Sequence, residues 1–297
     1  MKVLNFGSLN IDRVYQVPHF VSAGETLLST EYALFPGGKG LNQSIALARA
    51  GLDVYHAGKI GEDGAFLKAL LAENHVNTDH IFSENGATGH AIIQVDKAGQ
   101  NCILLFGGTN QTITCEEIDQ VLSCFMRGDY IVLQNEISNL DYIFDSAIKR
   151  GLRIVLNPSP YTPALLDYDL SAVDVLMLNE VEGKMMTGQS SEDCIMDALI
   201  ARFKNAVIVL TLGPDGSICY DRERIHRFGT YEVPIVDTTA AGDTFTGFFL
   251  EAYISTADCA HALKMASAAA SIAVGNAGAA KSIPYKENVI AFLTKIE

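Results

Sequence analysis

One segment in the last quarter of the sequence combines a carboxylate with small residues that leave the backbone accessible. Residues 236–247 read VDTTAAGDTFTG and lead into an apolar run, FFLEAYI. This pattern predicts a buried helix that begins at about Gly242 or Asp243. Backbone N–H groups at a helix start can hold a transferring phosphoryl group, and a carboxylate there could accept the proton of an attacking hydroxyl. An ordinary N-cap is the alternative interpretation of Asp243.

A second glycine-rich segment lies near the N-terminus, where residues 35–43 read FPGGKGLNQ. A Walker phosphate loop requires Ser or Thr after its lysine, whereas Gly40 follows Lys39 here. The P-loop interpretation is therefore excluded. What remains is a glycine-rich turn that opens a helix, with Asn42 in its first turn.

Polar side chains follow several of the predicted strands. Asn10 and Asp12 alternate along an extended segment after the first strand and so face the same side, although a turn or a cap would also explain them. Glu136 follows the apolar run at 130–134, and the sequence NEVE at 179–182 follows another strand. Simple helix capping is an equally good interpretation of NEVE.

Short apolar runs alternate with stretches of helical spacing through most of the chain. Strands are expected at 3–6, 54–57, 130–134, 153–156, 175–178 and 206–212, and helices at 42–50, 65–73, 115–125, 140–150, 180–187 and 192–203. This alternation predicts a parallel sheet covered by helices on both faces. The small residues from Ala257 onward indicate a closely packed helix rather than a low-complexity segment.

Two segments break this alternation, at about residues 12–36 and 88–107. Both contain short β-like runs, and the sequence DKAG at 96–99 is a plausible hairpin turn. We expect these segments to form a small sheet inserted into a single α/β domain that spans residues 1–297. Such a sheet would act as a lid or an interface, with a decorative insertion as the alternative.

Composition narrows the classes of function. The chain has 35 acidic and 21 basic side chains and a formal net charge of −14, which disfavours nucleic acid and anionic membrane surfaces as partners. Its six cysteines are scattered without a C-x-x-C pair, so we expect reduced thiols in a soluble, cytoplasmic protein. No G-x-G-x-x-G follows the first strand, which argues against a Rossmann-type dehydrogenase.

Two of these segments carry a resemblance to a known family. The sequence DTTAAGDTF at 237–245 resembles the C-terminal signature of the ribokinase (PfkB) family, and FPGGKGLNQ resembles its first signature. The resemblance extends from Gly7 to Pro284. It implies a ribokinase-like three-layer α/β/α fold, with a mainly parallel central sheet and a small inserted β-sheet lid. It also implies an ATP-dependent sugar kinase in which Asp243 is the general base and Ala241, Gly242 and Asp243 form the anion hole.

The same resemblance implies how the sugar is held. The residues that it places on the sugar are Asn10, Asp12, Gly38, Lys39, Asn42, Glu136 and Asp243. D-ribose, converted to ribose 5-phosphate, is the first choice of substrate. The segment Gly107-Gly108-Thr109-Asn110 departs from the family pattern, and Thr109 could alter the floor of the pocket. Deoxyribose, another pentose, a hexose, a sugar acid and a nucleoside therefore stay open.

The resemblance also implies a nucleotide site and two metal sites. ATP would contact Asn179, Thr211, Gly213, Gly216, Gly242 and Ser267. Mg²⁺ would be organised by Asn179 and Glu182, largely through water. K⁺, as an activator, would be surrounded by Asp237, Thr239, Ala273, Asn276, Gly278 and Ser282, with an irregular glycine-rich helix end as the alternative for this loop.

Two further expectations concern assembly and activity. A lid that covers a sugar with one face must bury its other face or keep it polar, so we expect a homodimer formed through the lid. A catalytically silent sugar-binding regulator on the same fold is the alternative of a different class. Loss of the base would mark such a protein, and Asp243 is present.

Overall fold

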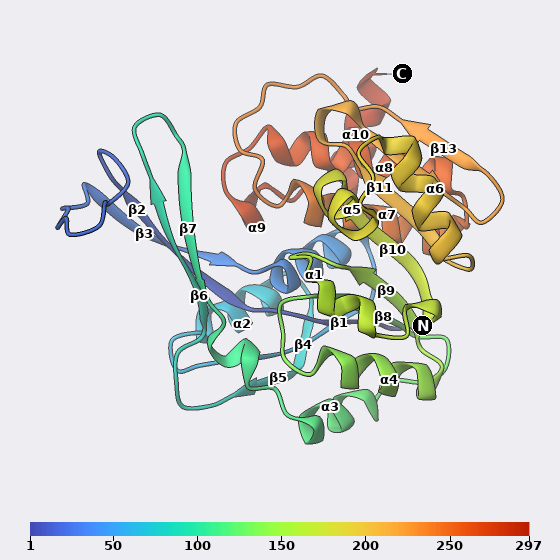
Figure 1. The fold of residues 1–297 in the computed structure, drawn as a ribbon, viewed down its shortest axis with the longest axis horizontal. Coiled ribbons are helices and arrows are strands. Elements are labelled where there is room, and N and C mark those ends of the chain that lie inside the picture. Colours follow the sequence, from blue (N-terminus) through green and yellow to red (C-terminus); the bar gives the residue numbers. More distant parts are fainter. Residues whose placement is uncertain (297) are drawn as a thin grey trace.

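A nine-stranded sheet forms the centre of the protein in the computed structural model, which describes residues 1–296 (Figure 1). Its strands are β1 Val3–Phe6, β4 Val54–Ile60, β5 Asn77–Ser83, β8 Tyr130–Gln134, β9 Arg153–Asn157, β10 Val173–Asn179, β11 Val207–Thr211, β12 Ser217–Tyr220 and β13 Ile225–Phe228. Their order across the sheet is β13-β12-β11-β10-β9-β8-β1-β4-β5. Only the β11–β12 and β12–β13 pairs are antiparallel.

Helices cover both faces of this sheet, because alternate residues of the buried strands point to opposite sides. One apolar core, which includes Val3, lies against α1 Lys39–Ala50, α2 Ala65–Glu73, α7 Ala241–Thr256, α8 Cys259–Val274 and α10 Lys286–Ile296. The other core, which includes Leu4, lies against α3 Cys115–Leu122, α4 Leu140–Arg150, α5 Glu180–Thr187 and α6 Glu192–Arg202. The predicted three-layer architecture is therefore confirmed.

A second sheet of four strands stands away from the three layers, at the left of Figure 1. We call it the lid. Its strands, in spatial order, are β3 Glu31–Gly37, β2 Asn10–Gln16, β6 Gly89–Val95 and β7 Asn101–Phe106. The pairs β3–β2 and β6–β7 are antiparallel, whereas β2 and β6 run parallel. The predicted turn at 96–99 joins β6 to β7 and is closed by the Asp96 N–H, which donates to the Gln100 carbonyl at 3.0 Å.

The ends of several elements differ from the sequence prediction. Strand β2 begins at Asn10, two residues before the predicted lid boundary, because Asn10 pairs with both Gly37 and Gly89. Helix α7 begins at Ala241, because the preceding residue, Ala240, takes a left-handed conformation with φ of 60° and so cannot belong to the helix. Asp243 therefore lies inside the first turn rather than at the cap.

Within residues 1–296, no helix is both long and apolar enough to cross a membrane.

Candidate active site

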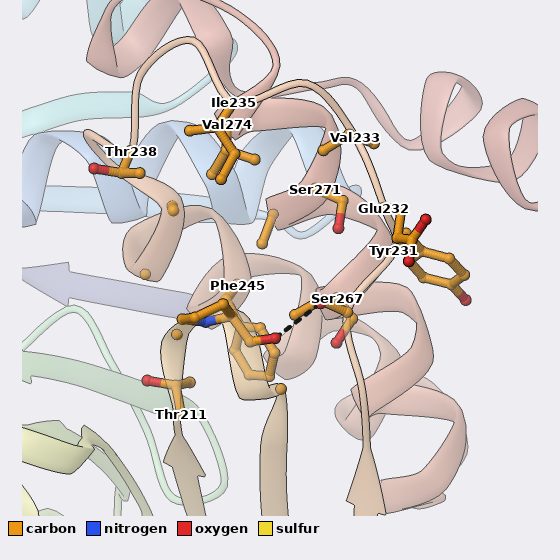
Figure 2. Close-up of a pocket in the computed structure, with 17 residues that line it drawn as sticks. Thr211, Tyr231, Glu232, Val233, Ile235, Thr238, Phe245, Ser267, Ser271 and Val274 are labelled. Atoms are coloured by element: carbon orange, nitrogen blue, oxygen red, sulfur yellow. Dashed lines mark hydrogen bonds between the residues drawn. The ribbon is translucent and has the colours of Figure 1, made fainter.

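Two adjoining pockets lie at the carboxyl ends of the central strands, where open α/β sheets place their ligands. The smaller has a volume of about 250 Å³, and its lining includes Lys39, Asn179, Glu182 and Asp243. The larger has a volume of about 430 Å³ and is shown in Figure 2. The residues common to both linings are Thr211, Thr238 and Gly242. Asp243 thus stands beside the point where the pockets meet.

The carboxylate of Asp243 is buried, with 7% of the residue exposed, and both of its oxygens accept hydrogen bonds. Asn42 Nδ2 donates to Oδ2 at 3.2 Å, and Gln43 Nε2 donates to Oδ1 at 3.0 Å. Each amide NH₂ group can only donate, so both oxygens of the carboxylate are held as acceptors in a fixed orientation. Asn42 Oδ1 is buried and has no hydrogen-bond partner within residues 1–296.

Lys39 carries a positive charge into the same site. Burial lowers the pKa of its ammonium, but Asp243, Glu136 and Glu182 together raise it further, and the net result is a raised pKa. The preceding residue, Gly38, ends the turn before α1 with φ of 96°, a conformation that favours glycine. Lys39 is consequently held as a cation among three carboxylates.

Glu136 is linked to the start of α1. Its Oε2 accepts from the Ser8 hydroxyl in a short hydrogen bond and from the Lys39 backbone N–H at 3.1 Å. Burial raises the pKa of this carboxyl, although the Ser8 hydrogen bond and Lys39 oppose the shift. Burial, followed by the nearby charge of Glu136, raises the pKa of Asp12 to about 6. Asp12, Glu136, Lys39 and Asp243 therefore form one electrostatically connected group.

The side chain of Asn10 is held by hydrogen bonding to Asn110, a buried residue that is 2% exposed. Asn110 Nδ2 donates to Asn10 Oδ1 at 2.8 Å and to the Leu9 carbonyl at 3.2 Å, while its Oδ1 accepts from the Leu9 N–H at 3.1 Å. Because Oδ1 of Asn10 is occupied, its amide nitrogen remains as a donor for a ligand. No separate role was predicted for Asn110 from the sequence.

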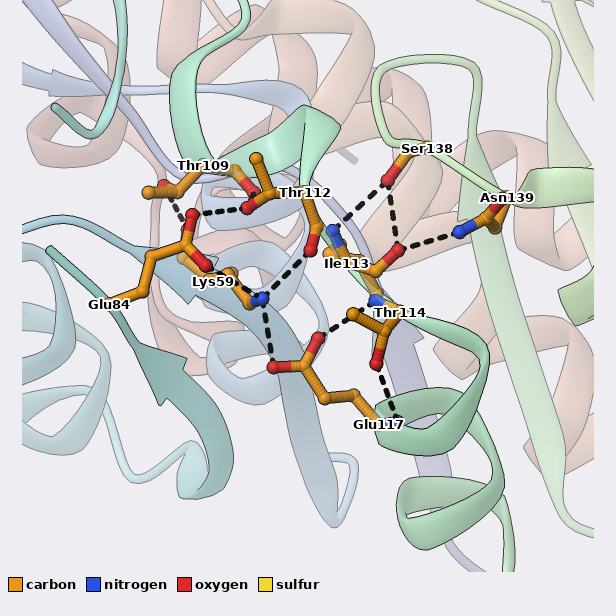
Figure 3. Close-up of polar contacts among 9 residues, drawn as sticks. All are labelled: Lys59, Glu84, Thr109, Thr112, Ile113, Thr114, Glu117, Ser138 and Asn139. Carbon is orange, nitrogen blue, oxygen red and sulfur yellow. Dashed lines mark hydrogen bonds and ion pairs between the residues drawn. The ribbon is translucent and has the colours of Figure 1, made fainter. Parts of the chain in front are cut away.

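The segment that carries Asn110 is anchored by a buried lysine, shown in Figure 3. Lys59 is 3% exposed and pairs with Glu84 at 3.1 Å and Glu117 at 2.8 Å. Its Nζ also donates to the Thr112 carbonyl at 2.8 Å. Thr109 Oγ1 donates to the Lys59 carbonyl at 2.9 Å. The hydroxyl of Thr109 is thus used in the anchor, and Thr109 is absent from the linings of both described pockets.

The predicted anion hole needs one correction. The N–H of Ala241 donates to the Thr238 carbonyl at 3.3 Å, so it does not point freely into the pocket. Within the described chain, the N–H groups of Gly242 and Asp243 have no acceptor. A Cβ built on Gly242 would meet no protein atom within 4 Å. The anion hole therefore stays a prediction for Gly242 and Asp243. The N–H of Ala241 is already used in the turn that precedes α7.

The NEVE sequence forms a complete capping box at the start of α5. Asn179 Oδ1 accepts from the Glu182 N–H at 2.9 Å, and Glu182 Oε2 accepts from the Asn179 N–H at 3.0 Å. The capping interpretation is thus realised, and it also turns Glu182 into the smaller pocket. Glu182 Oε1 has no protein donor within residues 1–296. One carboxylate oxygen facing a polar pocket fits a hydrated divalent cation.

The larger pocket gathers the remaining residues that were predicted to contact a nucleotide, namely Thr211, Gly213, Gly216, Gly242 and Ser267. Figure 2 shows Phe245 and Val274 among its apolar lining. The segment from Thr230 to Ile235 closes one side. Sequence reasoning missed this segment because it has no motif and belongs to no helix or strand.

Hydrogen bonds to Asp237 connect the two segments of the loop that was predicted to bind K⁺. One oxygen of Asp237 accepts from the Thr239 N–H at 2.9 Å and the Thr239 hydroxyl at 2.6 Å, and the other accepts from the Gly278 N–H at 2.9 Å. Burial raises the pKa of Asp237, but these hydrogen bonds outweigh it and leave the pKa lowered. The Ala273 carbonyl accepts from the Asn276 N–H at 3.0 Å. The Ser282 hydroxyl donates to the Ala279 carbonyl at 2.9 Å, which leaves its oxygen free to accept.

Asp237 therefore links Thr239 to Gly278, two of the residues predicted to surround K⁺, and the K⁺ site itself stays a prediction. Carbonyl, hydroxyl and single-carboxylate oxygens are ligands suited to a monovalent cation. Within residues 1–296, no cluster of three or more His, Cys, Asp and Glu side chains could hold a metal ion.

Comparison with known proteins agrees with this arrangement. The family model described as "pfkB family carbohydrate kinase" matches residues 1–286. The ribokinase of Haemophilus influenzae is 34% identical over 296 residues, which cover 97% of this chain and 96% of that protein. The ribokinase structure of Thermotoga maritima shares 31% identity and a TM-score of 0.87, and the match covers 99% of each chain. The Arabidopsis thaliana ribokinase complexed with ribose and ATP shares 28% identity and a TM-score of 0.86 over 98% of each chain. This chain belongs to the PfkB family of carbohydrate kinases.

Proposed function

We propose that this protein is an ATP-dependent ribose kinase that converts D-ribose to ribose 5-phosphate. The observation that carries the proposal is the buried carboxylate of Asp243, held by two amide donors where the two pockets meet. The names of the relatives support ribose, and the Arabidopsis thaliana structure was determined with ribose and ATP. The larger pocket then takes the nucleotide, and the sugar lies between Asp243 and the base of the lid.

The chemical step follows from this placement. The 5-hydroxyl of the sugar attacks the γ-phosphorus of ATP, so that a new O–P bond forms and the bond to the bridging β–γ oxygen breaks. Asp243 accepts the hydroxyl proton, and ADP leaves with the electron pair of the broken bond. The N–H groups of Gly242 and Asp243 can donate to the transferring phosphoryl group, and Lys39 adds a positive charge nearby. Asp12, Glu136 and the free Oδ1 of Asn42 accept hydrogen bonds from the other sugar hydroxyls.

Two metal ions are part of the proposal. Mg²⁺ would be held near Glu182 and Asn179 through water, where it would neutralise phosphate charge. K⁺ would be held by the oxygen atoms of the loop around Asp237, with the remaining ligands as predicted from the sequence. Equal rates in sodium and potassium salts would contradict the K⁺ assignment.

The decisive test is an ATP-consumption assay with Mg²⁺ and K⁺ over ribose, deoxyribose, fructose, sugar acids and nucleosides. We expect ribose to have the highest kcat/KM, and Asp243→Asn to lower kcat by about 10²- to 10⁴-fold. Preference for another sugar would replace ribose with that substrate. Sugar binding without turnover by the unmodified protein would favour a silent regulator.

We also propose that two copies associate through the lid. Strand β7 is exposed along its whole length, and the large apolar side chains on it are Ile103 52%, Leu104 67%, Leu105 59% and Phe106 55% exposed. Exposed strands with this apolar content favour association with a second sheet. Light scattering at micromolar protein should give the mass of a dimer, and Leu104→Glu should give a monomer. A monomeric unmodified protein would refute this assembly.

A further inference from the structure

A row of three buried amide side chains leads from the proposed base into the protein interior. Gln43, Gln134 and Asn5 are each 0% exposed. Gln43 Nε2 donates to Asp243 Oδ1 at 3.0 Å, and Gln43 Oε1 accepts from Gln134 Nε2 at 2.7 Å. Gln134 Nε2 also donates to Asn5 Oδ1 at 2.9 Å. These residues come from α1, β8 and β1, so the row crosses from a covering helix into the central sheet.

The orientation of each side-chain amide in this row, meaning which of its ends donates and which accepts, is determined by its neighbour. An ionised carboxylate only accepts hydrogen bonds, so Gln43 must turn its NH₂ group toward Asp243. Its carbonyl oxygen then faces Gln134, which must in turn present an NH₂ group. Asn5 completes the row by accepting from Gln134, and its own Nδ2 donates to the Gly40 carbonyl at 2.7 Å and to Ser44 Oγ at 2.8 Å.

We propose that Gln43, supported by Gln134, is a positioning residue that holds the Asp243 carboxylate by a hydrogen bond and aims it at the sugar hydroxyl. This inference rests on the proposed function, in which Asp243 is the base. Gln43 occupies one carboxylate oxygen from the interior side, and Asn42 occupies the other oxygen. Because the whole row is buried, water cannot replace a lost donor at low cost.

Charged groups from other elements also act on Asp243 and must be considered in the test. Lys39 at the start of α1 and Glu136 after β8 both interact electrostatically with Asp243. Glu182 on α5 acts on Lys39. None of these three side chains is altered by a substitution at Gln43 or Gln134, so their influence is common to all the variants compared.

The test compares the dependence of kcat on pH in the full-length protein for three variants with the unmodified enzyme. Gln43→Met keeps the side-chain length but removes the donor, and kcat at neutral pH should fall by about tenfold to 100-fold. The acidic limb of its kcat profile should move up by about one to two pH units. Gln43→Glu should move the limb further, because two adjacent carboxylates cannot both ionise easily. Gln134→Met should move it in the same direction by less.

A purely structural role would lower kcat or Tm without moving the acidic limb, and this result would overturn the inference. Gln120→Leu on the exposed face of α3 is the matched control, and it should leave both kcat and the profile unchanged. If one variant does not fold, the other two still test the proposal. An acidic limb of the kcat profile that stays at the same pH in any folded Gln43 or Gln134 variant counts against it. Failure of the unmodified enzyme to phosphorylate ribose would instead contradict the proposed function.

Discussion

The two sides of Asp243, one facing the proposed sugar site at the base of the lid and the other facing the larger pocket, are built in different ways. On the sugar side, Asp243, Glu136 and Asn10 each receive at least one hydrogen bond from a side chain or backbone group that is itself fixed. On the nucleotide side, the lining is largely apolar, and Ile235 is 70% exposed. Polar groups fixed in advance discriminate hydroxyl positions, whereas an apolar pocket selects mainly by shape. We therefore expect substitutions on the sugar side to have the larger effects.

The point of contact between the pockets should be the most sensitive. Gly242→Ala should lower kcat by about 10²-fold, because the new methyl group would occupy space needed by the transferring phosphoryl group. Tm should not fall, since this Cβ meets no protein atom within 4 Å and alanine favours the helix. Steady-state kinetics and thermal unfolding of the same preparation check the prediction. Activity equal to that of the unmodified enzyme would show that the phosphoryl group passes elsewhere.

The fixed orientation of Asn10 should matter next. Asn110→Leu removes the donor to Asn10, and KM for the sugar should rise by about tenfold to 100-fold while KM for ATP stays constant. Asn74→Leu is the matched control, because Asn74 is also a buried, hydrogen-bonded asparagine but lies at the end of α2, outside the linings of both pockets. This control should lower Tm and leave KM for the sugar unchanged. Equal changes in both KM values would mean that the sugar side is not separately organised.

The sugar side should also respond to pH. The pKa of Asp12 is raised to about 6, so at pH 5 only about a tenth of this carboxyl is ionised and KM for the sugar should rise about tenfold between pH 7 and pH 5. The raised pKa means that the folded state binds this proton more tightly than the unfolded chain. Stability without sugar should accordingly rise as pH falls from about 6 toward 4. Asp12→Asn should remove both trends, and a KM that is independent of pH in the unmodified enzyme would disprove this role.

The smallest effect is expected on the nucleotide side. Ser267 is 4% exposed and lines the larger pocket. Ser267→Ala should raise KM for ATP by about threefold at most and leave KM for the sugar unchanged, because one neutral hydrogen bond contributes little. Kinetics with each substrate varied in turn measure both values. A large increase in KM for ATP would show that this pocket also depends on a fixed polar contact.

Much of the architecture was predictable because local patterns agree with the tertiary structure. The apolar runs became central strands, and the helices predicted at 65–73, 140–150 and 180–187 have those bounds in the structure. The start of α7 was less predictable, since the left-handed Ala240 lies in a run of small residues with several allowed conformations. The segment from Thr230 to Ile235 has no sequence motif that would predict its part in the pocket, because its place there comes from contacts with distant helices.

The type of chemistry, the family and the principal candidates for the sugar, nucleotide and cation sites could all be predicted from sequence motifs. Motif residues such as Asp243 and Lys39 could be named because their types and neighbours are local properties of the chain. The residues that support these motif residues became visible only in the folded protein. Gln134 and Asn110 lie 91 and 100 positions from the partners that they fix, Gln43 and Asn10. Hydrogen bonds over such separations depend on how strands and helices pack, and this packing has no signature in either local segment.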